Sequence, residues 1–168
     1  MKHTLALIIS LALLTGSAYT ADKKTKDTAA VEAKATSPKG AKVYILFPKD
    51  GKSVKKKFTI RFGLKGMGIA PAGIKFPNTG HHHLIIDGAK FDINLPLQAS
   101  DQIKHFGGGQ TEATIELPLG KHTLQLVLGD HLHRPHDPPV LSKTITIISS
   151  QERQCVKLRV CPQLICTQ

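Results

Sequence analysis

The amino-acid sequence predicts an all-β domain, built as an antiparallel β-sandwich of about seven strands. Between Lys42 and Ile148, short stretches of alternating apolar and polar residues recur, and this period of two is typical of strands that bury one face. Glycine and proline residues typical of turns separate these stretches, and no amphipathic helix interrupts them. Short strands joined by regular turns favour an immunoglobulin-like or fibronectin-like sandwich.

Two strands open the predicted domain. Lys42–Phe47 is apolar and β-branched, and the turn PKDGKSV follows it. Lys57–Leu64 comes next and places Phe58, Ile60 and Phe62 on one face. We expect this face to lie in the core of the sandwich.

A third strand begins at His81, where the chain reads HHHLIID. The period of two places His81 and His83 on one face with Ile85 and Asp87, and the residues between them on the other face. The strand therefore carries a pair of imidazoles on one side. A loose connection is expected after it, from Gly88 to Gly109.

The second half of the domain contains the clearest strand signal. Leu124, Leu126 and Leu128 alternate with polar residues and with one valine, which predicts a strand with one face in the core. We expect the remaining strands at Thr111–Leu117, Lys121–Gly129 and Val140–Ile148, with a seventh left open near Phe91–Ile93.

The topology of such a sandwich brings two histidine pairs together. The third, fifth and sixth of the expected strands share a sheet, and the fifth runs antiparallel to both neighbours. The start of the strand at His81 therefore lies beside the end of the strand at Gly129. If the alternation continues past Gly129, His131 and His133 fall on the outward face, next to His81 and His83.

Four imidazoles on neighbouring strands predict a metal site. A His-x-His pair offers two nitrogens from one face of a strand, and a third imidazole from the adjacent strand completes a site for Zn(II) or Cu(II). Secondary candidates come from loops at the same end of the sandwich, and two carboxylates could orient the ring N–H groups. The predicted ligands are His81, His83, His131 and His133; the secondary candidates are His105, His136 and Met67; the orienting residues are Asp130 and Asp137.

Two other interpretations of the histidines stay open. They could form an inert, solvated surface, or they could donate hydrogen bonds to an organic or protein ligand, and a register slip of one residue would turn half of the rings inward. His122 is excluded from the site, because it lies about 9 strand residues from the pairs, close to 30 Å.

The two ends of the chain predict export and a separate tail. Lys2 and His3 precede an apolar segment and the small residues Gly16-Ser17-Ala18, as in a secretory signal peptide. We expect a signal peptide at 1–18, with cleavage as late as 21 left open, a flexible linker at 19–41, the sandwich at 42–148 and a tail at 149–168. Since no later run approaches the roughly 20 apolar residues that span a bilayer, the mature chain is expected to be soluble, without a transmembrane segment, and periplasmic or secreted.

The tail holds all three cysteines, Cys155, Cys161 and Cys166. Their spacing matches no usual zinc motif, and one intramolecular disulfide would leave one thiol free. An intermolecular disulfide and a dispensable extension both stay open.

Composition argues against nucleic acid as a partner. The formal net charge is +11, but many lysines fall in the linker and in the run Lys55 to Lys57. The chain has no Trp and two Tyr, so the stacking platforms expected for single strands are missing.

Three blocks, GLKGMGIAPAG, NTGHHHLIIDG and HFGGGQTEATIELPLGKHTLQLVLGDHLHRPHDPP, resemble a bacterial exported family of domains of unknown function. The resemblance covers roughly Lys42 to Ile148 and implies an exported single domain without an established activity. The residues themselves favour a domain that binds copper or zinc. The alternative is a metal-free module for adhesion or for interaction with an envelope protein. A zinc-dependent hydrolase is not favoured, because only Asp130 and Asp137 are at hand as acid or base.

Overall fold

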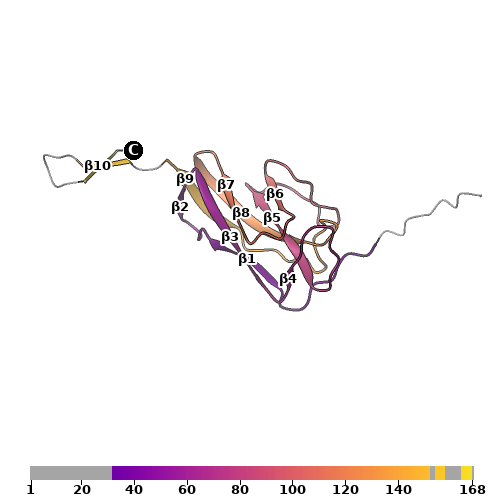
Figure 1. Ribbon diagram of the computed structural model, residues 1–168. Helices are drawn as coiled ribbons and strands as arrows, with labels where there is room; N and C mark the ends of the chain where they lie inside the picture. Colours follow the sequence, from indigo (N-terminus) through magenta and orange to yellow (C-terminus); the bar gives the residue numbers. More distant parts are fainter. Residues whose placement is uncertain (1–31, 152–153, 158–163, 168) are drawn as a thin grey trace, which may run out of the picture. The chain divides into compact units, whose positions relative to one another are not determined.

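The computed structural model describes residues 32–151, 154–157 and 164–167, and every regular element within these ranges is a strand (Figure 1). The predicted signal peptide, the first part of the predicted linker and Cys161 lie outside the described residues. None of the described segments forms a helix long and apolar enough to cross a membrane.

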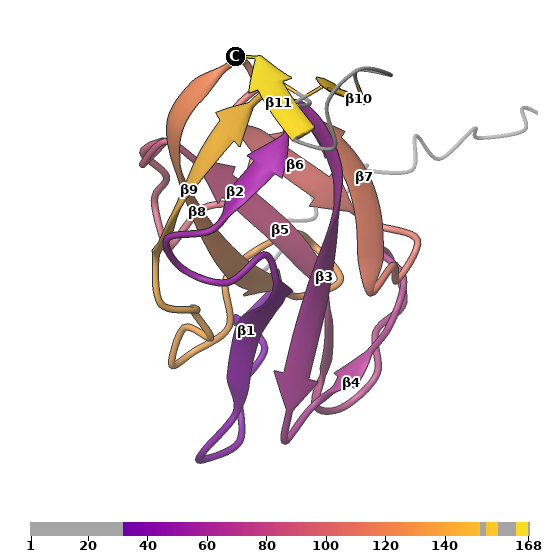
Figure 2. The same cartoon turned by 90° about the vertical axis from the view of Figure 1, so that its left-hand side faces the viewer.

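The first sheet has three antiparallel strands. It is formed by β1 (Lys42–Phe47), β3 (Lys57–Lys65) and β7 (Glu112–Glu116), with β3 in the middle. Figure 2 shows β3 crossing in front of a strand of the second sheet, β5.

The second sheet is larger and carries the histidines. Its order is β2-β9-β8-β5-β4, and β6 also pairs with β5. The pairs β5–β8, β8–β9 and β5–β6 are antiparallel, whereas the short strands β2 and β4 pair in parallel with β9 and β5. The strands are β2 (Ser53–Lys55), β4 (Gly68–Ile69), β5 (Thr79–Ile86), β6 (Ile103–Phe106), β8 (Gly120–Gly129) and β9 (Ile145–Ser150).

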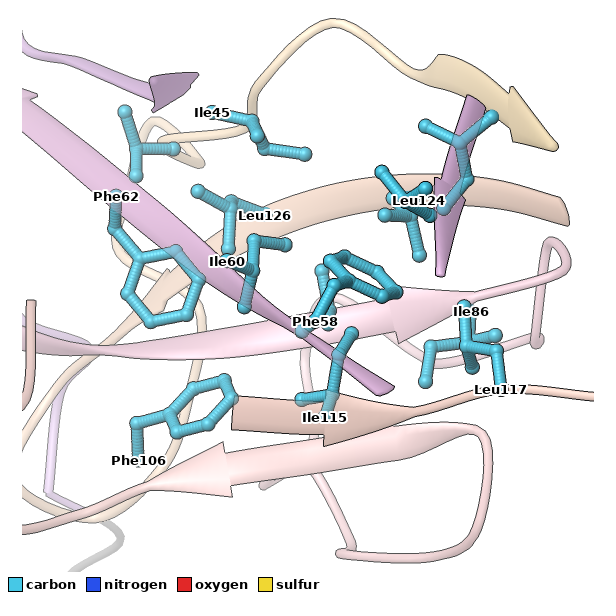
Figure 3. Packing of buried hydrophobic residues seen from close by; sticks show 14 of the residues in the cluster. Ile45, Phe58, Ile60, Phe62, Ile86, Phe106, Ile115, Leu117, Leu124 and Leu126 are labelled. Carbon is cyan, nitrogen blue, oxygen red and sulfur yellow. The ribbon is translucent and has the colours of Figure 1, made fainter. Parts of the chain in front are cut away.

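Apolar side chains from the facing sides of both sheets fill the core. The predicted face of β3, Phe58, Ile60 and Phe62, is buried against leucines of β8 (Figure 3). Leu124 and Leu126 are fully buried on β8, as the alternation predicted. The prediction of an antiparallel, immunoglobulin-like or fibronectin-like sandwich is therefore confirmed.

The region from Gly88 to Gly109 is more ordered than the sequence suggested. It contains β6, and its loop covers the outer face of β5 and β8 with a second, smaller apolar cluster. No strand forms at Phe91–Ile93 within the described chain; Phe91 instead packs against this cluster. The buried members of the second cluster are Ile85, Leu97, Ile103 and Val127.

The last strand of the sandwich begins later than predicted. β9 starts at Ile145, while Val140 and Ser142 join β8 through separate backbone hydrogen bonds to Leu128 and Leu126. The prolines at 138 and 139 and the Ser142 hydroxyl, which accepts a bond from the N–H of Leu126 at 2.8 Å, give this stretch an irregular path.

Segments flanking the predicted domain also form backbone pairs. Within the predicted linker, Thr36 bridges Asp137 in parallel, and the N–H of Ser37 donates to the carbonyl of Asp137 at 3.0 Å. In the tail, β10 (Gln154–Lys157) pairs with β11 (Leu164–Thr167), which puts Cys155 opposite Cys166 in the register.

Candidate metal centre

Strand β5 places two imidazoles on its outer face, directed away from the main core. His81 and His83 are both fully buried, because β6 lies on one side of β5, β8 lies on the other, and a loop covers the face. In the register, His83 is opposite His105 of β6 and Val127 of β8, while His81 is opposite Gly129. The pairing of β5 with β6 therefore adds a third imidazole beside the first two.

Two glycines make room for these rings. A Cβ added at Gly129 would lie 2.6 Å from Cε1 of His83, and a Cβ added at Gly107 would overlap the ring of His105. Real Cβ atoms do not approach other atoms so closely, so both rings occupy space that only glycine leaves open. Gly129 ends β8, and Gly107 directly follows β6.

The fourth imidazole comes from the turn that follows β8. Asp130 shapes this turn, because its Oδ1 accepts hydrogen bonds from the N–H groups of Leu132 at 2.8 Å and Arg134 at 2.9 Å. Its Oδ2 accepts from the Arg134 guanidinium, through Nε at 3.1 Å and Nη2 at 3.0 Å. Between them, His133 has φ of +66°, a left-handed conformation that is uncommon for residues other than glycine.

Four rings meet at this end of the sandwich. The ring centroid of His81 lies 4.8 Å from that of His83, 5.0 Å from that of His105 and 5.0 Å from that of His133. The remaining three centroid distances run from 4.7 to 5.9 Å. We call these four residues, His81, His83, His105 and His133, the histidine cluster.

Burial keeps the inner rings of the histidine cluster uncharged. Burial, followed by the neighbouring rings of His105 and His133, lowers the pKa of His81 to about 4. Burial lowers the pKa of His83 to about 2, and partial desolvation, followed by the neighbouring ring of His133, lowers the pKa of His105. At neutral pH the lone pairs of these three imidazoles are therefore available to a ligand.

The ring nitrogens of His81 and His83 have no hydrogen-bond partner among the described residues, although they are fully buried. A buried polar group without a partner costs about 1 to 3 kcal/mol, and native proteins contain few such groups. Four unpaired nitrogens on two neighbouring side chains of one strand face mark a site for a bound ligand that accepts their lone pairs or forms hydrogen bonds with them.

The cluster has the donor set of a transition-metal site. One nitrogen each from His81, His105 and His133 lies within 4.8 Å of the others. Imidazole nitrogens bind zinc at about 2.0 to 2.1 Å, which sets nitrogen separations of roughly 3.3 to 4.2 Å. Since His105 is exposed and His133 is half-buried, small rotations of these two rings would close the difference.

A cavity of about 210 Å³ lies against the outer two rings of the histidine cluster. The segment from Pro96 to Ala99 forms one wall, and His105 and His133 form the other. The N–H of Leu97 donates to the carbonyl of His133 at 2.9 Å, which fixes this segment beside the turn.

The structure separates the predicted site residues into two groups. It brings His81, His83 and His133 together with the secondary candidate His105. His131 is not in the set of nitrogens within 4.8 Å; it lies in the turn, and its carbonyl accepts a bond from the N–H of Gly73 at 3.0 Å.

The other candidates have structural surroundings of their own. His136 is fully buried, with Nδ1 3.2 Å from the carbonyl of Leu128 and Nε2 3.1 Å from that of Thr79. Met67 packs against the main core, and Asp137 is exposed. Asp130 supports the turn through its bonds to the backbone and to Arg134.

Two further histidines lie apart from the cluster. The Nδ1 of His82 is 3.1 Å from the carbonyl of Gln110, and its ring packs against Phe62 on the core side of β5. His122, near the start of β8, is 2.8 Å from a carboxylate oxygen of Asp87, and its other ring nitrogen is 2.9 Å from the carbonyl of Pro118.

The fold and the family can be compared with known proteins. A family model described as Domain of unknown function (DUF4399) matches residues 60–149. No curated protein is similar enough in sequence to be counted as a relative.

Two solved structures give weak matches. An endo-beta-1,4-mannanase from Thermotoga petrophila is 18% identical, with a TM-score of 0.39, over 67% of this chain and 20% of that chain. Fibronectin(III)-like modules of CbhA from Clostridium thermocellum are 14% identical, with a TM-score of 0.34, over 66% of this chain and 99% of theirs. This chain thus spans about a fifth of the mannanase and almost all of the module.

Proposed function

The chain belongs to the family described as Domain of unknown function (DUF4399), and we propose that it binds a copper or zinc ion in its histidine cluster. One observation carries this proposal. His81 and His83 are fully buried beside two further imidazoles, and none of their four ring nitrogens has a hydrogen-bond partner in the described part of the chain.

A metal ion accounts for this arrangement better than an inert histidine surface does. Solvated histidines would be exposed, whereas the inner two rings are fully buried. Their desolvation opposes protonation, so the rings cannot satisfy one another as imidazolium and imidazole at neutral pH. An ion bound at the centre would accept one lone pair from each ligating ring.

The donor set favours copper or zinc over other common ions. All candidate ligands are imidazoles, with no carboxylate or thiolate in the described set within 4.8 Å. Imidazole suits Zn(II) and Cu(II), whereas Mg(II) and Ca(II) prefer oxygen ligands. The usual order of affinities places Cu(II) above Zn(II), so we expect copper to bind more tightly.

The proposed setting is the periplasm or the outside of the cell. It rests on the n-region, the apolar segment and the small residues of 1–18, which have the pattern of a secretory signal. In such a setting the domain would carry, buffer or sense the metal ion. We propose no catalytic role, because Asp130, the buried carboxylate beside the cluster in the described part of the chain, is paired with Arg134.

A second candidate function is interaction with another protein of the cell envelope. Exposed apolar side chains favour it: Ile74 is 55% exposed, Phe76 is 68% exposed and Leu95 is 59% exposed. They lie on two loops that are hydrogen-bonded to the turn at 131–133. This surface is compatible with metal binding and with a metal-free module alike.

Titration calorimetry on the purified protein without an affinity tag tests metal binding directly. We expect one Cu(II) or Zn(II) ion per chain. At a free metal concentration one hundred times the dissociation constant, the free energy of unfolding should rise by about 2.7 kcal/mol. Binding no tighter than about 10 μM, or a chain that unfolds at the same denaturant concentration with and without metal, would contradict the proposal.

Replacing Gly107 with alanine should weaken metal binding with little loss of stability. The added Cβ would overlap the His105 ring, and because this ring is exposed it can swing away from the cluster. We expect the dissociation constant to rise at least about tenfold, since one ligand is displaced, while the free energy of unfolding changes by less than about 1 kcal/mol. Calorimetry and urea denaturation measure the two quantities.

Gly108→Ala is the matched control for this prediction. The three atoms nearest to a Cβ at Gly108 all belong to the side-chain amide of Gln110, the closest at 3.1 Å. Neither Gly107 nor Gly108 has a positive φ, so alanine fits the backbone at both positions. Equal affinities of the two variants would contradict the role assigned to the His105 ring.

A further inference from the structure

We propose that the metal ion keeps a coordination position open toward the cavity at Pro96–Ala99 and binds a small anion there. This inference rests on the proposed function, because it needs an ion in the histidine cluster. It adds a second ligand class to the site, namely small anions with an oxygen or nitrogen donor, such as hydroxide or a short carboxylate.

The first argument is the position of the cavity. His81 and His83 are fully buried and approach the site from the sheet, whereas His105 is exposed and His133 is half-buried. These two outer rings line the cavity of about 210 Å³. An ion held between the inner and outer rings is therefore reached from this side and not through the sheet.

The second argument is charge. The three imidazoles whose nitrogens lie within 4.8 Å of one another, those of His81, His105 and His133, carry no charge as ligands. They would leave the charge of a divalent ion uncompensated and one position of a tetrahedral site open. Asp130 is the buried carboxylate beside the cluster, but its oxygens already accept bonds from Arg134 and from two backbone N–H groups. No carboxylate is among the described residues that line the cavity. A buried charge is stable only when it is paired, so an anion from solution is favoured at the open position.

The third argument is size. A water molecule takes up about 30 Å³ of liquid volume, so the cavity holds several waters or one anion of a few non-hydrogen atoms. It is smaller than the roughly 300 Å³ at which pockets for larger organic ligands begin. Its wall at Pro96, Leu97 and Ala99 is apolar, and Gln98 supplies the single side-chain amide. The cavity thus fits a small anion held mainly by the metal.

Azide titration of the Cu(II)-loaded, untagged protein tests this inference. We expect a new charge-transfer absorption band and a changed electron paramagnetic resonance spectrum, both saturating with azide concentration. Copper binding is measured first by calorimetry. If copper does not bind, this inference fails, and the proposed function fails with it unless zinc binds in the same calorimetric titration. If copper binds and azide changes neither spectrum, only this inference is overturned.

Ala99→Phe adds a larger side chain at the wall of the cavity and leaves all four histidines of the cluster in the sequence. We expect azide affinity to fall at least about tenfold, while the Cu(II) dissociation constant stays within about threefold of the original. Ala33→Phe makes the same change at an exposed alanine outside the cavity lining and should leave both affinities unchanged. Equal azide affinities of the Ala99→Phe variant and the unchanged protein would overturn the assignment of the anion to this cavity.

Discussion

Replacing Leu126 with alanine should lower the free energy of unfolding by about 2 to 5 kcal/mol. Leu126 is fully buried on β8, opposite Leu84 of β5 in the register, and its backbone is hydrogen-bonded to Ser142 on the other side. Truncation leaves a cavity in a core that both sheets build, and strands paired on both sides relax little to fill it. Urea denaturation followed by far-ultraviolet circular dichroism measures the change.

Leu119→Ala is the control for this measurement. Leu119 lies just before β8 and is 49% exposed, so the same truncation should cost less than about 0.5 kcal/mol. A loss of that small size at Leu126, or equal losses at the two positions, would show that the alternation along β8 has been assigned to the wrong faces.

Alternation along the chain was sufficient to predict most of the sandwich. Residues 58, 60 and 62 and residues 124, 126 and 128 point into the core as their period of two predicted, because one face of each strand packs against the other sheet. The pattern fails at β6, whose four residues are too few to show a period and whose Ile103 packs in the separate outer cluster. It fails again at the start of the last strand, where prolines and the Ser142 side chain interrupt the ladder with β8.

The position of His133 in the site depends on the turn after β8, which the alternation of apolar residues does not predict. The sequence predicted that the start of the third strand lies beside the end of Lys121–Gly129, and the register of His81 opposite Gly129 agrees. The predicted facing of His131 and His133 assumed that the strand continues past Gly129. Asp130 instead accepts the next backbone N–H groups, and the chain turns, with His133 in a left-handed conformation. The directions of the His131 and His133 rings are therefore set by this turn and not by strand alternation.

His105 illustrates a second limit. Its place beside His83 follows from the pairing of β6 with β5, which joins residues 22 positions apart across a loop without its own regular elements. The signal that could have found it is the glycine run after His105, since Gly107 has no side chain to occupy the space that the His105 ring fills. A similar signal, Gly129, follows the leucines of β8.

Replacing His133 with alanine should raise the dissociation constant for Cu(II) or Zn(II) by about 100-fold or more, the largest effect we expect at this site. Loss of a residue that only supports a ligand typically costs 10-fold to 100-fold, and loss of a direct ligand should cost at least as much. His133 supplies one of the three nitrogens within 4.8 Å of one another. Because it lies in a turn on the surface of the sandwich, its removal should change the free energy of unfolding of the metal-free protein little.

His131→Ala is the control that distinguishes the ligands seen in the structure from those that strand alternation predicted. Both residues lie in the same turn, and a strand continued past Gly129 would have treated them alike, but His131 is outside the set of nitrogens within 4.8 Å. We expect its replacement to change the dissociation constant by less than about threefold, whereas His81→Ala should match His133→Ala. Calorimetric titration of the three untagged variants makes the comparison. Equal losses for His131→Ala and His133→Ala would mean that the ion is held by the strand-like arrangement, and the cluster of His81, His83, His105 and His133 would then not be the binding site.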